Sequence, residues 1–477
     1  MKTEKTENPE FGQPNIKPGV GDDVTHDAVF GAVTEDGPNY RSVGWIATTI
    51  LMAKSNIGLG VLGIPSAFQV LGLIPGVILI LAIGGTATWT TYVIGQFKLN
   101  HPDVYSIDDA GFKMFGRWGR EILGAVFLLF LYRPLANASQ LQDWVFVTGS
   151  GLLSVSIALN AVSTHGTCTA VFVVVAAVVA ICLNSIRTLG RITILAWVGL
   201  FSIIAAIFTV TIAVGVQDRP ASAPQTGHWE SDYKLFGTPT FLEASTAVSS
   251  LIFAFASVSL CFSFAAEMKE PKHYGRAVFS CLSLVMAIYL VIGIVVYYYC
   301  GSYVSSPAMG SAGPLMKKVA YGISIPGVMV STILLSHLAA KYVFVRLLRG
   351  TPHLSSNSMR HWVTWFSCTI GVVVVGYIIA SAIPVFSTLI SLIGALLGTL
   401  MTFQPMACMW IYDNWTTDKS RRTPRWYAMV AFSCFVILAG TFIMIVGTWG
   451  SVVEINAQYK ASGGSAAWSC ADNSNSV

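Results

Sequence analysis

The chain has 477 residues, of which 54% are hydrophobic and only 11% charged, against about 25% charged residues in an ordinary soluble domain. With a mean hydropathy of +0.65, this composition excludes a soluble enzyme and requires an apolar solvent around much of the chain. The net charge of +5 does not indicate a nucleic-acid partner, because the basic residues lie in short segments between apolar runs rather than on one face.

The order of polar and apolar segments predicts a polytopic, all-α membrane protein. Residues 1–42 are polar and lack the apolar run of a signal peptide, so we expect a disordered cytosolic tail there. Hydropathy windows of about 19 residues then predict eleven transmembrane helices within a domain at 43–449, followed by a second tail at 450–477. The expected spans are 43–66, 71–97, 122–148, 167–185, 190–215, 241–266, 276–299, 324–347, 362–382, 385–412 and 426–449.

The distribution of basic residues predicts the orientation. Of 28 Lys and Arg residues, twenty fall on the cytosolic side if the amino terminus is cytosolic, five on the opposite side and three within spans. The five are Arg219, Lys234, Lys317, Lys318 and Lys460, and the three are Lys54, Arg133 and Lys341. This bias favours a cytosolic amino terminus, and an odd number of spans places the carboxyl terminus outside the cell or in a lumen. We expect the plasma membrane, with the vacuolar membrane as the alternative.

Missing motifs narrow the chemistry. The chain has no Gly-Lys dipeptide, hence no P-loop, and no His-Glu-x-x-His helix, so ATP-driven transport and zinc hydrolysis lack their minimal residues. We therefore expect a protein that is not an enzyme, has no cofactor or metal and uses an ion gradient. Cys300 and Cys470 both fall on the expected non-cytosolic side, and the sequence leaves open whether they form a disulfide.

The first expected span has the composition of a broken helix. It holds three glycines and one proline within the eight residues from Gly58 to Pro65, and these cost about 1 and 3 kcal/mol each in a helix interior. Freed backbone groups at membrane depth are tolerated only where protein or a polar cavity satisfies them. We therefore predict unwound backbone beside a binding cavity, with close helix packing as the alternative.

The sixth expected span is predicted to be broken from its position. It contains Phe253–Ser257 and has no glycine or proline at its middle. It crosses in the direction opposite to the first span, as paired discontinuous helices do in an inverted five-plus-five repeat. Backbone N–H groups at the first break would then bind an anion, and carbonyls at the second a cation. A zwitterion fits both.

These segments also resemble a known family. The run Lys54–Phe68, continued by Gly72 and Gly76, resembles the first-span signature of the amino acid/auxin permease family of the APC superfamily, and Phe253–Phe255 with Glu267–Pro271 resembles its sixth-span signature. Within that family, the chain resembles the fungal neutral amino-acid permeases. The resemblance implies a LeuT-like fold with a 5+5 inverted repeat, discontinuous helices 1 and 6, and proton- or sodium-coupled uptake of amino acids.

The resemblance also implies a set of substrate-binding residues. Those expected to cradle the substrate carboxylate are Asn56, Ile57, Gly58, Leu59 and Gly60. Those expected to hold the ammonium and flank the side chain are Phe253, Ala254, Phe255, Ala256 and Ser257. Because neither set carries a charged side chain, we expect neutral aliphatic and aromatic substrates, since a charged one would need a partner to offset its desolvation.

Ionisable residues within spans are functional candidates by default. His337 and Lys341 are four residues apart and share a helix face, with Ser336 beside them. If the resemblance holds, they face the first break, where His337 could carry a proton. The alternative is a neutral His337, with Lys341 reaching the cytosolic interface. We expect Lys54 to hold the break through its carbonyls or through Glu267.

The sequence therefore predicts a secondary active transporter that imports neutral amino acids, with protons, by alternating access in the lipid bilayer. Two alternatives stay open. One is sodium coupling. The other is a membrane sensor that binds amino acids without net flux. The sequence does not predict the oligomeric state.

Overall fold

The computed structural model describes residues 26–27, 31–32, 42–58, 60–128, 143–186, 189–220, 223–224, 226–348, 351, 353–354, 358–382, 386–415, 422–461 and 470–474. Within these residues the regular structure is helical, apart from the short hairpin of β1 (His26–Asp27) and β2 (Gly31–Ala32). The α-helices are α1 (Trp45–Asn56), α2 (Ile64–Leu71), α3 (Leu73–Asn100), α4 (Ile107–Leu128), α5 (Asp143–Ser163), α6 (Thr169–Leu183), α7 (Leu189–Val216), α8 (Phe241–Ala254), α9 (Cys261–Ala266), α10 (Tyr274–Cys300), α11 (Pro314–Leu348), α12 (Met359–Ala382), α13 (Phe386–Ile393), α14 (Thr399–Thr402), α15 (Gln404–Trp415) and α16 (Pro424–Ala461).

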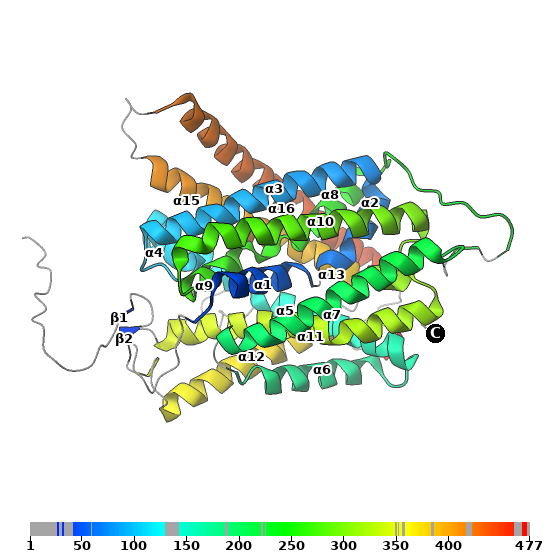
Figure 1. Ribbon diagram of the computed structural model, residues 1–477, viewed down its shortest axis with the longest axis horizontal. Coiled ribbons are helices and arrows are strands. Elements are labelled where there is room, and N and C mark those ends of the chain that lie inside the picture. Colours follow the sequence, from blue (N-terminus) through cyan, green and yellow to red (C-terminus); the bar gives the residue numbers. More distant parts are fainter. Residues whose placement is uncertain are drawn as a thin grey trace, which may run out of the picture.

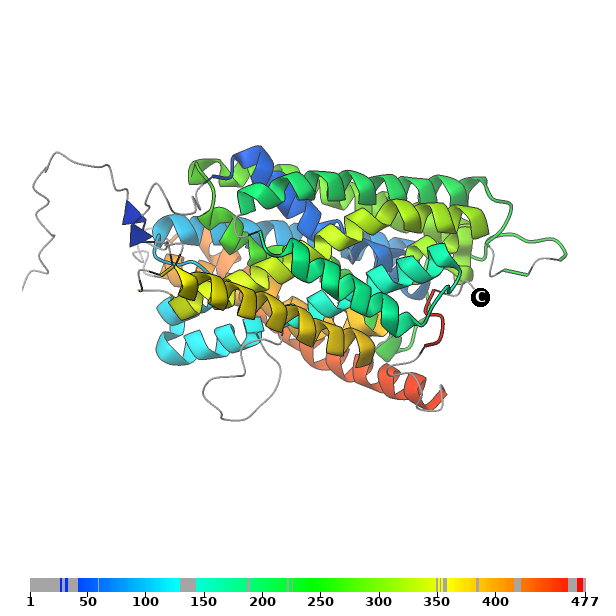
Figure 2. The ribbon, with the colours of Figure 1, turned by 90° about the horizontal axis from the view of Figure 1, so that it is seen from below.

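The long helices run side by side along one direction and form a bundle (Figures 1 and 2). In the described part of the chain, nine helical runs are long and apolar enough to cross a membrane, and α5 and α6 add two shorter apolar helices. Apolar side chains cover the outside of the bundle: Leu438 and Ile445 of α16 are 71% and 63% exposed. Such an outer surface is stable only in lipid, so the protein is an all-helical integral membrane protein.

The chain is interrupted between α1 and α2 and between α8 and α9. These two breaks lie inside the bundle because the surrounding helices enclose them. Helix α11 packs on α5 and α7, and α10 packs on α3, on α1 and on α2. The β1–β2 hairpin lies at one end of the bundle, and residues 470–474 lie at the other (Figures 1 and 2).

The expected third span ends too early at 148. Residues up to Leu128 belong to α4, and α5 begins at Asp143 and continues to Ser163 through residues expected to form a loop; residues 129–142 lie outside those described. Polar residues of α5, such as Ser150, Ser154 and Asn160, are buried in the bundle rather than exposed to lipid. A hydropathy window scores them as polar and therefore shifts the span toward the apolar end of α4.

Two other helices extend beyond their expected spans. Helix α11 begins at Pro314 rather than near 324, and α16 ends at Ala461 rather than near 449. Both additions carry charged residues, Lys317 and Lys318 in α11 and Glu454 in α16. Hydropathy windows detect the apolar section of a helix and miss its polar ends.

A disulfide ties the carboxyl-terminal segment to the bundle. Cys470 pairs with Cys168, which immediately precedes α6, whereas Cys300 is a free, buried thiol. The same segment is held by hydrogen bonds, from the Thr169 hydroxyl to the Ala471 carbonyl at 2.6 Å and from the Asn160 amide to Asn473 Oδ1 at 2.8 Å. The expected fourth span begins at 167, so Cys168 was not weighed as a disulfide partner.

Candidate functional site

The first span is interrupted as predicted. Helix α1 ends at Asn56, Ile57 is non-helical with φ −79° and ψ 82°, and a 3-10 turn at Gly60–Gly63 leads into α2. Pro65 lies in the first turn of α2, where its missing N–H leaves no helical bond unmade. Leu59, and Arg133 of the expected third span, lie outside the described residues.

The sixth span is interrupted as well. Helix α8 ends at Ala254, Phe255 has φ −107° and ψ 7°, and a 3-10 turn at Ala256–Leu260 leads into α9. No glycine or proline causes this break. The relation of this span to the first one predicted it, which local composition could not do.

The two breaks lie against each other. A Cβ atom on Gly60 would be 2.5 Å from the Ala254 Cα, so only glycine permits this approach of the two backbones. The Tyr289 hydroxyl of α10 lies 2.8 Å from both the Asn56 and the Ala254 carbonyl oxygen. The sequence analysis did not identify Tyr289, because a tyrosine in an apolar span is hard to distinguish from an ordinary core residue.

The described members of the predicted substrate-binding sets lie around this junction, and all of them except the partly buried Ala256 are buried. Phe255 packs edge-on against Tyr289 with ring centroids 5.1 Å apart. Phe253 lies beside the π-helical turn Gly394–Gly398 that follows α13, since a Cβ on Gly394 would be 3.0 Å from the Phe253 Cβ. Ser257 is also buried. The structure therefore brings the described members of both predicted sets into one region.

Lys54 holds the first break. Its side chain is fully buried, and its Nζ donates to the Ile57 carbonyl at 3.2 Å and to the Ser331 hydroxyl of α11. The expected contact with a carbonyl of the break is thus present, whereas the expected alternative, Glu267, binds another lysine. In the part of the chain that the structure describes, no salt bridge reaches Lys54. Sequence reasoning did not identify Ser331, one of many hydroxyl residues in the spans.

Glu267 and Lys341 form a buried salt bridge between the end of α9 and α11. Both residues are at most 1% exposed, so the alternative in which Lys341 reaches the cytosolic interface is wrong. Next to this pair, the Val43 N–H donates to the Glu267 carbonyl at 3.2 Å and the Val43 carbonyl accepts from the Lys269 N–H at 2.9 Å. The segment before α1 is therefore bound to the segment after α9.

His337 and Ser336 have other surroundings. The His337 ring is fully buried and packs edge-on against Trp365 at 5.1 Å, and among the described residues neither ring nitrogen has a hydrogen-bond partner. The Ser336 hydroxyl donates to the Thr332 carbonyl and accepts from the Asn184 amide at 2.6 Å. Ser331 of α11 lies at the first break, where its hydroxyl accepts from Lys54 Nζ.

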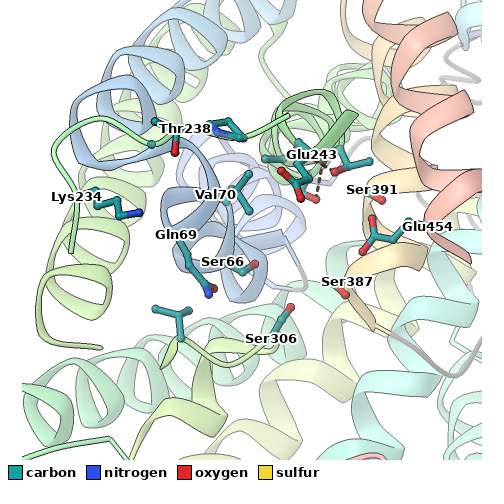
Figure 3. Close-up of a pocket in the computed structure, with 17 residues that line it drawn as sticks. Ser66, Gln69, Val70, Lys234, Thr238, Glu243, Ser306, Ser387, Ser391 and Glu454 are labelled. Carbon is teal, nitrogen blue, oxygen red and sulfur yellow. Dashed lines mark hydrogen bonds between the residues drawn. The ribbon is translucent and has the colours of Figure 1, made fainter. Parts of the chain in front are cut away.

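A polar cavity of about 480 Å³ opens near the two breaks. It lies between α2, α8, α13 and α16, and Figure 3 shows Glu243 and Glu454 facing the same space from α8 and α16. Ser250 also lines it, one helical turn before Ala254. The cavity therefore lies on the side of the two breaks where α2 and α8 are found.

Comparisons with known proteins agree with this architecture. A transmembrane transporter of Gibberella moniliformis is 32% identical over 444 residues, covering 93% of this chain and 90% of the relative. The N amino acid transport system protein of Neurospora crassa is also 32% identical over 444 residues, with 92% and 90% covered. The closed, bromovinylhydantoin-bound structure of Mhp1, a nucleobase-cation-symport-1 family transporter, superposes with a TM-score of 0.52 at 12% identity, covering 93% of this chain and 99% of that one.

The structural likeness shows a LeuT-like transporter fold, as the resemblance implied. The family model described as transmembrane amino acid transporter protein matches residues 41–453, nearly the whole helical domain and both breaks. This chain belongs to the transmembrane amino acid transporter family, the amino acid/auxin permeases, and is a transporter rather than an enzyme.

Proposed function

We propose that the protein imports neutral amino acids together with protons, and that Lys54 is the residue that binds the coupled proton. The observation that carries this proposal is the position of the Lys54 ammonium, which is fully buried and bound to the Ile57 carbonyl and the Ser331 hydroxyl. A cation at this point links the first break to α11.

The neutral partners of Lys54 make proton release possible. A buried ammonium is costly unless it is paired, and here its hydrogen-bond acceptors are uncharged groups. When it loses its proton, no unpaired opposite charge is left behind. Its attraction to the carbonyl end of α1 also weakens, so protonation can control how tightly the first break is held against α11.

The neutral substrate class rests on the residues around the junction. The described members of the predicted binding sets are apolar residues, a serine, an asparagine and glycines. A charged substrate side chain would lose its hydration there without gaining an ionic partner. We therefore expect aliphatic and aromatic amino acids to be accepted and lysine, arginine, aspartate and glutamate to be rejected.

The orientation is also a proposal. The disulfide between Cys168 and Cys470 supports a carboxyl terminus on an oxidising side, since disulfides persist there and not in the cytosol. The bias of basic residues supports the same assignment. An epitope tag after the last residue should be accessible to antibody on intact cells if the protein is in the plasma membrane and inaccessible if it is in the vacuolar membrane.

The test is uptake of labelled leucine and phenylalanine into cells that express the protein. We expect saturable accumulation that a protonophore abolishes and that persists without sodium. Saturable binding without accumulation would identify a sensor, and loss of uptake without sodium would identify sodium coupling. Either result would contradict the proposal.

Variants then test the role of Lys54. Lys54→Met should abolish gradient-driven uptake and make the remaining exchange of preloaded substrate independent of pH. His337→Gln serves as the comparison, because His337 is an equally buried titratable residue on α11 that packs on Trp365. If His337→Gln, and not Lys54→Met, separated accumulation from exchange, the proton site would be His337.

A further inference from the structure

One side chain from outside both breaks touches both of them. The Tyr289 hydroxyl oxygen is 2.8 Å from the carbonyl oxygen of Asn56, the last residue of α1, and 2.8 Å from that of Ala254, the last residue of α8. The tyrosine is fully buried, and its ring is held by the edge-on contact with Phe255. The position of the hydroxyl is therefore set by packing.

Acceptor lone pairs outnumber donors at this point. A tyrosine hydroxyl carries one proton and two lone pairs, so it can donate to only one of the two carbonyl oxygens at a time. The Asn56 carbonyl also accepts from the Gly58 N–H at 2.9 Å. The two carbonyl oxygens and the Tyr289 oxygen therefore keep lone pairs that an additional donor can use, and the buried Asn56 Oδ1 has no hydrogen-bond partner among the described residues.

The electrostatics favour a cation as the missing donor. Asn56 and Ala254 end their helices, so their carbonyls belong to the carboxyl ends where helix dipoles are negative. Two such ends converge on the Tyr289 oxygen. A primary ammonium carries three N–H donors and a positive charge, which matches both the number of acceptors and the sign of the potential.

We propose that Tyr289 recognises the α-ammonium of the substrate. In the occupied site the hydroxyl donates to one carbonyl and accepts from the ammonium, which donates also to the other carbonyl. The inference rests on the proposed function, since it concerns the same substrate and site. It assigns the preference of the transporter for α-amino acids over α-hydroxy acids to one hydroxyl group on α10.

The test compares Tyr289→Phe with Tyr274→Phe. Both changes remove a buried hydroxyl from α10. Tyr274, however, is the first residue of α10, and its hydroxyl donates to the Thr91 carbonyl of α3 at 3.1 Å. For each protein, leucine and its 2-hydroxy analogue compete against uptake of labelled phenylalanine. The analogue keeps the carboxylate and side chain and replaces the ammonium by a neutral hydroxyl.

The wild type and Tyr274→Phe should prefer leucine by the same factor. In Tyr289→Phe this preference should fall about 10- to 100-fold, the effect of one hydrogen bond to a charged group, while inhibition by the hydroxy acid changes little. Equal weakening of both competitors would assign a purely structural role to Tyr289 and overturn the inference, as would an unchanged preference.

Two controls keep the outcomes distinct. If the wild type transports no neutral amino acid at all, the proposed function fails, whereas a wild type that transports and a Tyr289→Phe variant with full preference contradicts only the inference. If Tyr289→Phe does not reach the membrane, a wild-type structure with bound leucine decides. An ammonium nitrogen within about 3.5 Å of the Tyr289 oxygen supports the inference, and a more distant one overturns it.

Discussion

Among the described residues, two lysines are fully buried, and their surroundings differ. Lys341 forms a salt bridge with Glu267 near the segment before α1, whereas Lys54 is bound by a carbonyl and a hydroxyl at the first break. Loss of a proton from Lys341 would leave the Glu267 carboxylate buried without its partner. Loss of a proton from Lys54 would leave only neutral groups. Burial alone therefore does not identify a proton site, and the charge of the partners does.

The largest expected effect follows from breaking the salt bridge. Glu267→Gln should remove the carboxylate that pairs with the buried Lys341 ammonium and lower stability by about 3–5 kcal/mol, measured as thermal unfolding of the purified protein in detergent. The double variant Glu267→Gln, Lys341→Met removes both charges and should regain most of that loss. A single variant as stable as the wild type would show that the pair is not desolvated.

Lys54→Met should cost less stability than Glu267→Gln, since it removes a donor from one carbonyl and one hydroxyl rather than the counter-charge of a buried ion. The expected loss is about 1–3 kcal/mol in the same unfolding assay, while proton-driven uptake is lost completely. Equal destabilisation by the two variants would contradict the comparison between the lysines.

Crowding Lys54 without removing it gives a smaller effect. A Cβ on Gly199 of α7 would lie 2.9 Å from the Lys54 Cε and 2.7 Å from the Val330 Cβ. Gly199→Ala should therefore destabilise by roughly 1–2 kcal/mol, with overpacking exceeding the gain in helix propensity, and should slow uptake. The matched control is Gly85→Ala in α3, where a Cβ meets nothing within 4 Å. That variant should be neutral or slightly more stable, and a loss in both variants would exclude a local effect on Lys54.

The smallest effect concerns Asp232, a charged residue outside the spans whose hydrogen-bond donors are neutral groups. The Asp232 carboxylate accepts from the Ser302 N–H at 2.7 Å and from its hydroxyl at 2.6 Å. Partial burial acts to raise the pKa of Asp232, but the hydrogen bonds from Ser302 outweigh it and lower the pKa. Because the folded-state pKa is the lower one, the stabilisation is present above the unfolded pKa of about 3.9 and is lost as the pH falls through the folded value.

For this exposed loop the contribution is at most about 1 kcal/mol. Asp232→Asn should lower the unfolding temperature slightly at pH 7, and this difference should shrink as the pH falls through the folded-state pKa, because the wild-type carboxylate becomes protonated as well. A difference that stays constant as the pH falls would assign the effect to packing rather than to the charge.

The features that could be predicted from the sequence are those that depend on neighbouring residues or on the direction in which a span crosses the membrane. The apolar runs predicted an all-helical membrane domain, and the glycines between Gly58 and Gly63 with Pro65 predicted the first break. The position and crossing direction of the sixth span relative to the first predicted the second break, which the structure has at Phe255. The third span was misplaced because the polar residues of α5 are buried among other helices, which hydropathy does not register.

The amino-acid sequence by itself determined which segments are apolar enough to form membrane helices, where the first of these helices cannot stay wound and which charged residues lie within apolar segments, since these depend on neighbouring residues and on the solvent. The tertiary structure alone decided that Lys54 meets Ser331, that Lys341 meets Glu267, that Tyr289 lies between two breaks and that Cys470 pairs with Cys168. Each of these contacts joins residues that are far apart in the chain. No local pattern specifies such partners, because only the packing of whole helices brings them within bonding distance.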